Sequence, residues 1–296
     1  MAMPASVLIG TTTGLVDATA GRAVAHVGHD VVAVAGPWAV VNGHEVVAAD
    51  GRRAPPIEAA RVACLAQLGG GEVLAGTAGA HVYRAGDGTV ERLVSFDDAE
   101  GRDRWYTPWG GPPAVRAIAV SPAGTVLANV HVGGILRSDD GCATWRATVD
   151  IDLDVHQVVA GDGPALAASA AGLAESRDDG RTWRVVDEGL ESTYARAVAV
   201  SGGTVLLSAS DGPMGERAAL YRRPLTGGRP FERCRAGLPE WFEGNVDTFW
   251  LDGLPDGGAA FVSPGGQVYG SADEGATWEL LADAIAGPHC LSLAGA

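Results

Sequence analysis

The sequence contains no lysine, and all 21 of its basic residues are arginines. The absence of lysine excludes a catalytic Schiff-base lysine and the lysine of a phosphate-binding loop. The 36 acidic residues outnumber the arginines, which gives a net charge of −15 at pH 7. Because phosphate binding requires clustered positive charge, we expect no nucleic-acid partner.

Long apolar runs are also lacking. No stretch reaches the ~18 residues of a membrane span, and the opening residues, MAMPASVLIG, lack the basic start and cleavage site of a secretory signal. We therefore expect a cytoplasmic protein without a membrane partner. Cysteines are few and widely spaced, which indicates neither a zinc pair nor a disulfide framework. Buried free thiols are expected at Cys64, Cys142, Cys234 and Cys290.

The sequence is instead rich in turn residues and short apolar runs. Its 43 glycines and 16 prolines separate runs of Val, Ala and Leu such as VRAIAV and VLANV, and no stretch sustains a helical period. This pattern predicts an all-β chain of many short strands.

One octet ending in tryptophan occurs three times, as SDDGCATW at 138–145, SRDDGRTW at 176–183 and SADEGATW at 271–278. These octets resemble the Asp-box, or bacterial neuraminidase repeat, with the pattern S-x-D-x-G-x-T-W; the first departs once, with Cys142 in the glycine position. The resemblance implies a β-propeller of the sialidase-like and photosystem assembly factor-like superfamily. It also implies that the octet is a turn between the third and fourth strands of a blade, so Asp140, Asp178 and Asp273 are expected to be structural.

The strand pattern around VRAIAV recurs seven times, at a mean interval of about 43 residues, which suits a four-stranded propeller blade. The predicted innermost strands are DVVAVA at Asp30, VACLAQ at Val62, VRAIAV at Val115, VHQVVA at Val155, ARAVAV at Ala195, VDTFWL at Val246 and HCLSLA at His289. The last of these has no blade after it, whereas the N-terminal segment lacks an innermost strand. We predict a single domain, residues 1–296, that forms a seven-bladed β-propeller of four-stranded antiparallel blades, closed by the C-terminal strand joining the N-terminal blade.

The first positions of these innermost strands should surround the mouth of the central channel. They read His289, Asp30, Ala63, Arg116, His156, Arg196 and Asp247 around the ring. His289 between Asp30 and Asp247 suits a catalytic base, whereas His156 between Arg116 and Arg196 suits an anionic substrate. His131, at the end of a neighbouring second strand, would add a donor on the anion side.

Two long connections over this mouth carry aromatic residues. One contains Trp105, Tyr106 and Trp109, and the other contains Trp241. Aromatic side chains in loops either line a pocket for a ring-bearing or sugar-like ligand or pack on one another as a lid.

The sequence thus predicts a small-molecule binding protein or a lyase or hydrolase that acts on an anionic or sugar-like substrate. The N-terminal arginine motif of sialidases is missing, so sialidase activity is not expected. The alternatives are a non-catalytic scaffold for a protein partner and a channel mouth whose charges simply pair. No metal or other cofactor is assigned, although Asp152, Asp154 and His156 with His131 or His289 offer a metal-binding alternative.

Overall fold

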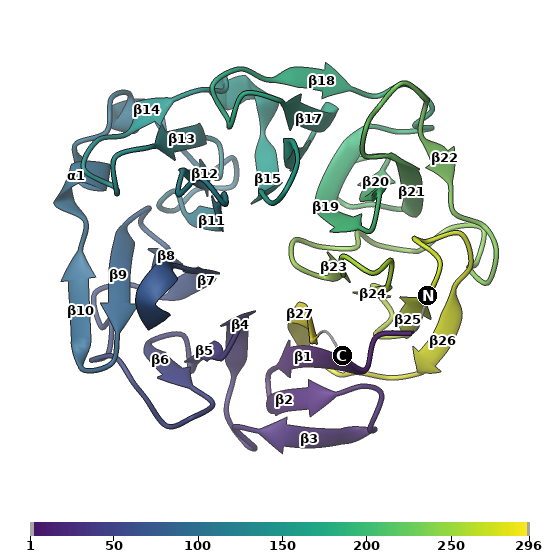
Figure 1. Cartoon of the computed structure of the whole chain (residues 1–296), viewed down its shortest axis with the longest axis horizontal. Helices are drawn as coiled ribbons and strands as arrows, with labels where there is room; N and C mark the ends of the chain where they lie inside the picture. Colours follow the sequence, from purple (N-terminus) through teal and green to yellow (C-terminus); the bar gives the residue numbers. More distant parts are fainter. Residues whose placement is uncertain (1–2, 295–296) are drawn as a thin grey trace. The chain divides into compact units, whose positions relative to one another are not determined.

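The structure, a computed structural model, describes residues 3–294 and consists almost entirely of antiparallel β-sheet (Figure 1). Seven sheets follow one another along the chain, six with four strands and one with three. The chain is a seven-bladed β-propeller, as the repeat period predicted. Helix in the described residues is confined to α1 (Val94–Asp97) and to the 3-10 turns η1 (Gly69–Gly71), η2 (Arg102–Arg104) and η3 (Ile151–Leu153).

The strands belong to two compact units, here called the middle unit, residues 31–167 and 174–184, and the terminal unit, the remaining described residues. Three sheets of the middle unit contain β4 (Val31–Ala35), β5 (Trp38–Val41) and β6 (Glu45–Ala48); β7 (Val62–Gln67), β8 (Val73–Thr77), β9 (Val82–Gly86) and β10 (Thr89–Arg92); and β11 (Val115–Val120), β12 (Val126–Val130), β13 (Gly134–Ser138) and β14 (Arg146–Ala147). The next sheet along the chain contains β15 (Val155–Val159), β16 (Ala165–Ser169), β17 (Gly172–Ser176) and β18 (Arg184–Val186).

The terminal unit contains the other three sheets. Two of them contain β19 (Tyr194–Ser201), β20 (Thr204–Ser210), β21 (Ala219–Pro224) and β22 (Glu232–Arg233), and β23 (Leu251–Gly253), β24 (Ala259–Val262), β25 (Val268–Ser271) and β26 (Glu279–Ala282). The last contains β1 (Ser6–Thr11), β2 (Gly14–Asp17), β3 (Arg22–Ala25) and β27 (Pro288–Ala294).

The closing blade combines the two ends of the described chain. β27 pairs antiparallel with β1, which continues into β2 and β3 (Figure 1). This arrangement confirms the predicted closure by the C-terminal strand. It gives β1 a hydrogen-bonded neighbour on each side, so β1 is not an edge strand of its sheet.

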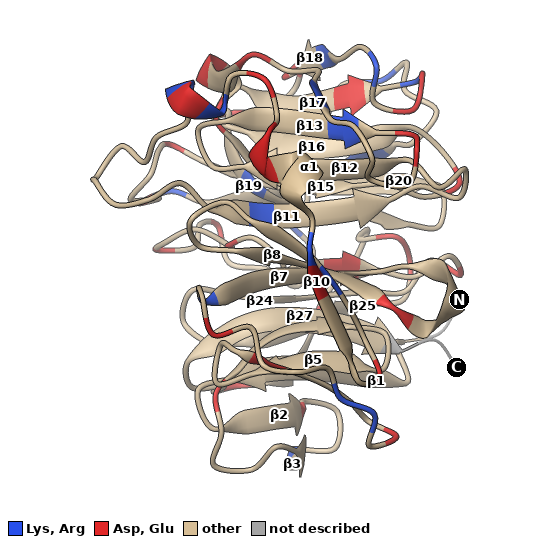
Figure 2. Cartoon of the chain, turned by 90° about the vertical axis from the view of Figure 1, so that its left-hand side faces the viewer, with Lys and Arg blue, Asp and Glu red and all other residues tan. Residues whose placement is uncertain are grey.

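Strands inside a blade are short and apolar because both of their faces are buried, whereas outer strands such as β3 and β14 are largely exposed. Every residue of β12 and of β13 is buried, including Arg137. In the terminal unit, Phe261 stacks on Tyr269 at 5.1 Å between ring centroids and meets Trp278 edge-on at 5.0 Å. Charged residues lie mostly on loops, where acidic and basic segments are interspersed (Figure 2).

The three octets fold as the same turn between the third and fourth strands of their blades. In the last octet, Ser271 donates to Asp273 and accepts from the Gly275 amide, while Asp273 accepts from both the amide and the hydroxyl of Thr277. The corresponding threonine hydroxyls lower the pKa of Asp140 and of Asp178 to about 2. These carboxylates are occupied by local structure, as expected.

Cys142 occupies the glycine position of the first octet with a positive φ of 74°, close to the 81° of Gly180 and the 76° of Gly275. The left-handed backbone is therefore retained without glycine. All four cysteines are buried free thiols, as predicted. Within residues 3–294, no helix combines the length and the apolarity needed to cross a membrane.

Three details of the predicted strands are wrong. The blade β4–β6 has three strands, and an isolated bridge between Val47 and Arg53 stands where a fourth was expected. The strand predicted to start at Val246 starts at Leu251, because residues 248–250 form a turn and bend. Asp30 precedes β4 rather than belonging to it.

Asp252 on β23 ties the closing strand to its neighbour. Its carboxylate accepts hydrogen bonds from the Leu293 amide at 3.0 Å and from the Gly253 amide at 2.8 Å. Desolvation nevertheless dominates and raises the pKa of Asp252 to about 6. The folded chain therefore holds the Asp252 proton more tightly than the unfolded chain does.

We expect the Asp252→Asn substitution to flatten the pH dependence of stability. Because the Asp252 pKa is raised from 3.8 on folding, the free energy of unfolding of the unmodified chain should fall as pH rises from about 4 to about 6. Denaturant titrations across this range should show a smaller decline for Asp252→Asn. The exposed neighbour Asp256 provides the control, and parallel profiles for all three proteins would contradict this account.

Candidate functional site

Several predicted site positions coincide with a recurring irregularity at the start of the innermost strand of a blade, although in β4 it falls at Val32 and not at the predicted Asp30. One extra residue interrupts the pairing of β4, β7, β11, β19 and β27 with the adjacent strand. The extra residue is Val32, Ala63, Arg116, one of Arg196 and Ala197, and His289, respectively. A bulge redirects the side chain it carries, which explains why Arg116 and Arg196 are partly exposed between buried neighbours and why His289 is partly exposed beside the buried Cys290.

A side chain from the preceding blade fixes the backbone ahead of several predicted positions. Asn129 of β12 donates to the Val155 carbonyl at 2.9 Å, immediately before His156. Ser208 of β20 donates to the Val246 carbonyl at 3.0 Å, immediately before Asp247. The backbone of Asp247 is therefore fixed directly after the Val246 carbonyl, although strand β23 begins only at Leu251.

The Cys64 thiol makes the equivalent contact to the Val115 carbonyl at 3.5 Å, ahead of Arg116. Burial raises the pKa of Cys64 to about 12, so the thiol remains neutral and retains its proton for this contact. Its role is therefore structural.

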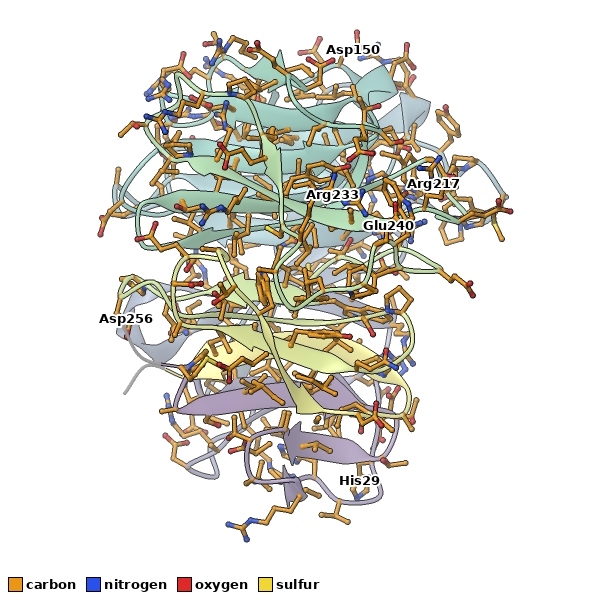
Figure 3. The ribbon with its side chains drawn as sticks, turned by 90° about the vertical axis from the view of Figure 1, so that its right-hand side faces the viewer. His29, Asp150, Arg217, Arg233, Glu240 and Asp256 are labelled. Atoms are coloured by element: carbon orange, nitrogen blue, oxygen red, sulfur yellow. The ribbon has the colours of Figure 1, made fainter. Side chains whose placement is uncertain are left out.

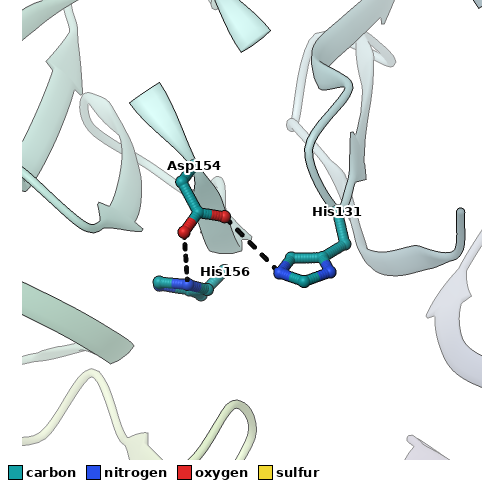
Figure 4. Close-up of side chains that lie close together, drawn as sticks. All are labelled: His131, Asp154 and His156. Atoms are coloured by element: carbon teal, nitrogen blue, oxygen red, sulfur yellow. Dashed lines mark ion pairs between the residues drawn. The ribbon is translucent and has the colours of Figure 1, made fainter. Parts of the chain in front are cut away.

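In the middle unit, His131, Asp154 and His156 form what we call the His–Asp–His cluster (Figure 4). His131 is the first residue after β12, His156 lies on β15, and Asp154 directly precedes β15. The Asp154 carboxylate lies between the two imidazoles, with Oδ1 3.5 Å from His131 Nε2 and Oδ2 3.4 Å from His156 Nε2. The structure thus brings together His131 and His156, which the sequence assigned to one site, around a carboxylate named only as an alternative metal ligand.

Backbone conformation directs the cluster side chains. Asp154 has a left-handed backbone, with φ 49° and ψ 69°, after the turn η3, and its amide donates to the Ile151 carbonyl. Val132, which follows His131, also has a positive φ, of 45°, an uncommon conformation for a β-branched residue. Such conformations persist where the surrounding structure enforces them, and they are enriched at functional sites.

The cluster is a largely buried polar centre in which Asp154 carries the carboxylate. The side chain of His156 is fully buried, that of His131 is 5% exposed and that of Asp154 is 25% exposed. Burial alone would raise the pKa of Asp154, but the hydrogen bond and charge of His156 and the charges of His131 and Arg116 outweigh it, so the pKa lies below 3.8.

The three aromatic residues predicted above this position differ in their surroundings. Trp109 is 68% exposed and its ring lies 5.0 Å from that of His131. Trp105 is buried against Phe96, and the guanidinium of Arg102 lies over its ring, so Trp105 belongs to the packed interior. Tyr106 is 48% exposed.

In the terminal unit, His289 and Asp30 form the pair that the sequence predicted for a catalytic base. His289 Nε2 lies 2.7 Å from Asp30 Oδ1, and the two side chains are 30% and 26% exposed. Asp247, the second predicted partner of His289, instead accepts from Arg196 Nη1 at 3.2 Å. Although burial disfavours the charge of Arg196, Asp247 and Tyr194 outweigh this effect and raise its pKa.

Trp241 of the terminal unit lies between two arginines. The guanidinium carbon of Arg233 is 3.6 Å, and that of Arg217 4.3 Å, from the centroid of its ring (Figure 3 labels both arginines). This sandwich occupies the ring that the sequence assigned to substrate binding.

A cavity of about 270 Å³ lies at a different place in the terminal unit. It is lined by Arg222, Arg223 and Arg229 together with Glu232, Asp273 and Glu274. Asp273 belongs to an octet, and the acidic residues offset the arginines, so we assign the functional chemistry to the His–Asp–His cluster and the His289–Asp30 pair and not to this cavity.

Comparison with known proteins identifies only the fold. No protein-family model and no curated protein matches the sequence. Among solved structures, a GH74 xyloglucanase from Xanthomonas campestris is 18% identical with a TM-score of 0.50, over 94% of this chain and 43% of that protein. YCF48 bound to D1 peptide is 17% identical with a TM-score of 0.46, over 71% and 64% of the two chains.

A computationally designed protein, Ika8, is 15% identical with a TM-score of 0.55, over 95% of this chain and 81% of its own. The chain therefore spans less than two thirds of the xyloglucanase and of YCF48. Its structural neighbours include a hydrolase and a peptide-bound protein, and at these identities what the chain shares with them is the β-propeller fold.

Proposed function

We propose that this chain is a small-molecule binding protein whose ligand occupies the His–Asp–His cluster and the indole face of Trp109. The observation that carries this proposal is an exposed tryptophan placed 5.0 Å from a buried histidine that itself contacts a partly buried carboxylate. Exposed indoles beside convergent buried polar groups are characteristic of ligand sites, because the ring supplies apolar area and the polar groups supply orientation.

The chemistry of these residues favours an anionic or sugar-like ligand. Arg116 and the two imidazoles offer hydrogen-bond donors for carboxylate, phosphate or hydroxyl groups, and Asp154 offers an acceptor. The indole of Trp109 offers a flat face for a ring. The octets, which fold as one shared turn, support the resemblance to the Asp-box family, whose members serve several unrelated functions.

Replacing Trp109 by alanine should weaken ligand binding without unfolding the chain. Saturation-transfer NMR of a panel of small carboxylates, phosphates and sugars would identify ligands, and calorimetry would measure their affinities. Loss of one stacking face corresponds to about a tenfold weaker affinity. The panel is run with and without EDTA so that any contribution of a metal ion is separated.

The control is Met214→Ala, which removes another large exposed side chain, 84% exposed, in the terminal unit. Met214→Ala should bind as the unmodified chain does, whereas Trp109→Phe should retain most of the affinity. Equal affinity of Trp109→Ala and the unmodified chain for every ligand found, or no ligand in the panel, would reject the proposal.

A second candidate function is a lyase or hydrolase activity with His289 as general base. The supporting observation is the 2.7 Å contact between His289 and Asp30, an arrangement that orients an imidazole for proton transfer. The partial exposure of both side chains gives a substrate access to them.

If His289 is the base, an activity detected on a panel of esters, glycosides and hydroxy acids should fall about 100-fold or more in His289→Gln. Asp30→Asn should lower it less, because the imidazole remains. His44, whose Nδ1 contacts the Ile57 carbonyl at 2.9 Å, provides the control histidine for the same Gln substitution. Full activity of His289→Gln would eliminate this mechanism.

A further inference from the structure

We propose that His131, Asp154 and His156 together hold a divalent transition-metal ion, for which Zn²⁺ is the best match. This inference rests on the proposed function in one respect, because both place the binding site at the His–Asp–His cluster. Two imidazole nitrogens and one carboxylate oxygen are a ligand set that suits zinc, and the three candidate ligand atoms all lie within 4.8 Å of one another.

The distances within the cluster differ from those of an ordinary histidine–carboxylate pair. The chain provides two such pairs for comparison, His81 with Asp97 at 2.6 Å and His289 with Asp30 at 2.7 Å. In the cluster, the carboxylate of Asp154 is 3.5 Å from His131 and 3.4 Å from His156. Both distances exceed a charge-assisted hydrogen bond.

A shared metal ion accounts for these longer separations. Ligand atoms at the ~2.0–2.1 Å bond lengths of zinc, placed at tetrahedral corners, are roughly 3.4 Å apart. The contacts of Asp154 come close to this spacing, one through each carboxylate oxygen, with Oδ1 3.5 Å from His131 and Oδ2 3.4 Å from His156. Asp154 Oδ1 is buried and lies 3.5 Å from His131 Nε2, so a cation bound here would meet a carboxylate oxygen that already points at an imidazole.

The cluster leaves one side open. The two histidines are almost wholly buried, and the quarter of Asp154 that is exposed faces out of the protein interior. Three protein ligands leave a fourth position for water or substrate, which is the arrangement of catalytic rather than structural zinc sites. With Trp109 beside His131, an oxyanion bound at that position would also contact the indole.

Preorganisation supports the same assignment. Asn129 fixes the backbone before His156 through the Val155 carbonyl, and the left-handed conformation of Asp154 turns its side chain between the imidazoles. Arg116 adds a positive charge near Asp154. The positive charge of Arg116 disfavours binding of a cation alone. It attracts an oxyanion once the metal ion is bound, so metal and oxyanion should bind with positive cooperativity.

The test is a zinc titration of the full chain after removal of metal with EDTA, with a chromophoric chelator as competitor. The unmodified chain should bind zinc with a stoichiometry of one ion per chain, and His131→Gln and Asp154→Asn should each bind it at least about 100-fold more weakly. The matched control is His81→Gln, which alters the ordinary histidine–carboxylate pair of the same unit and should leave zinc affinity unchanged.

Cobalt substitution provides a second measurement. Co²⁺ in the unmodified chain should show the intense visible absorption of a four-coordinate site, and that absorption should be lost in His131→Gln even if Asp154→Asn fails to fold. Circular dichroism of each metal-free variant checks folding. Zinc affinity equal in the unmodified chain and His131→Gln, or no stoichiometric zinc in the unmodified chain, would overturn the proposal.

The ligand panel separates this inference from the proposed function. Small-molecule binding that is unchanged by EDTA, with no zinc bound, rejects the metal site and retains the binding function. Stoichiometric zinc without any small-molecule ligand rejects the binding function and retains the metal site.

Discussion

The arrangement of the candidate residues depends on one recurring type of hydrogen bond. In each case a buried side chain of one blade donates to the carbonyl group of a valine at the start of the next blade. Asn129 to Val155 and Ser208 to Val246 are two examples. A buried carbonyl without a donor costs about 1–3 kcal/mol, so this bond fixes where the following blade begins. The residue after the valine is then held at a defined place even where regular strand has not started, as at Asp247.

The same constraint explains how a fold of apolar strands presents polar groups. Regular alternation would send successive residues to opposite faces, and both faces of these strands are covered. A single extra residue breaks the alternation and carries its side chain out of the packed layers, as for Arg116 and His289. The blades can therefore retain Val and Ala in their strands while one position in each varies freely in charge.

The sequence predicted the features that repeat and missed those that occur once. Seven blades and the closure of β27 on β1 follow from a period that averages over many residues, and the structural role of the octets was implied by their resemblance to the Asp-box. The missing fourth strand beside β6 and the late start of β23 depend on local turns that no period records. Trp105 was assigned to a loop whose aromatic residues line a ligand pocket or form a lid, and only the tertiary structure brings it against Phe96 and Arg102. Asp154 was the harder case, because its place between two histidines requires the left-handed backbone that follows η3.

The left-handed backbone of Asp154 also affects how rigidly the His–Asp–His cluster is held before a ligand binds. A left-handed conformation at a residue other than glycine costs on the order of 1–3 kcal/mol, and Asp154 and Val132 both adopt it beside the same histidines. Such strain persists only where the surroundings allow no relaxed alternative, and here the surroundings are buried strands anchored by Asn129. A site held this rigidly pays little conformational entropy when a ligand arrives, since its side chains are already ordered. Its selectivity must then come from the fixed spacing of the three groups and not from closure around the ligand. Ions and molecules that match the 3.4–3.5 Å separations should bind, and those that require the carboxylate to move should not.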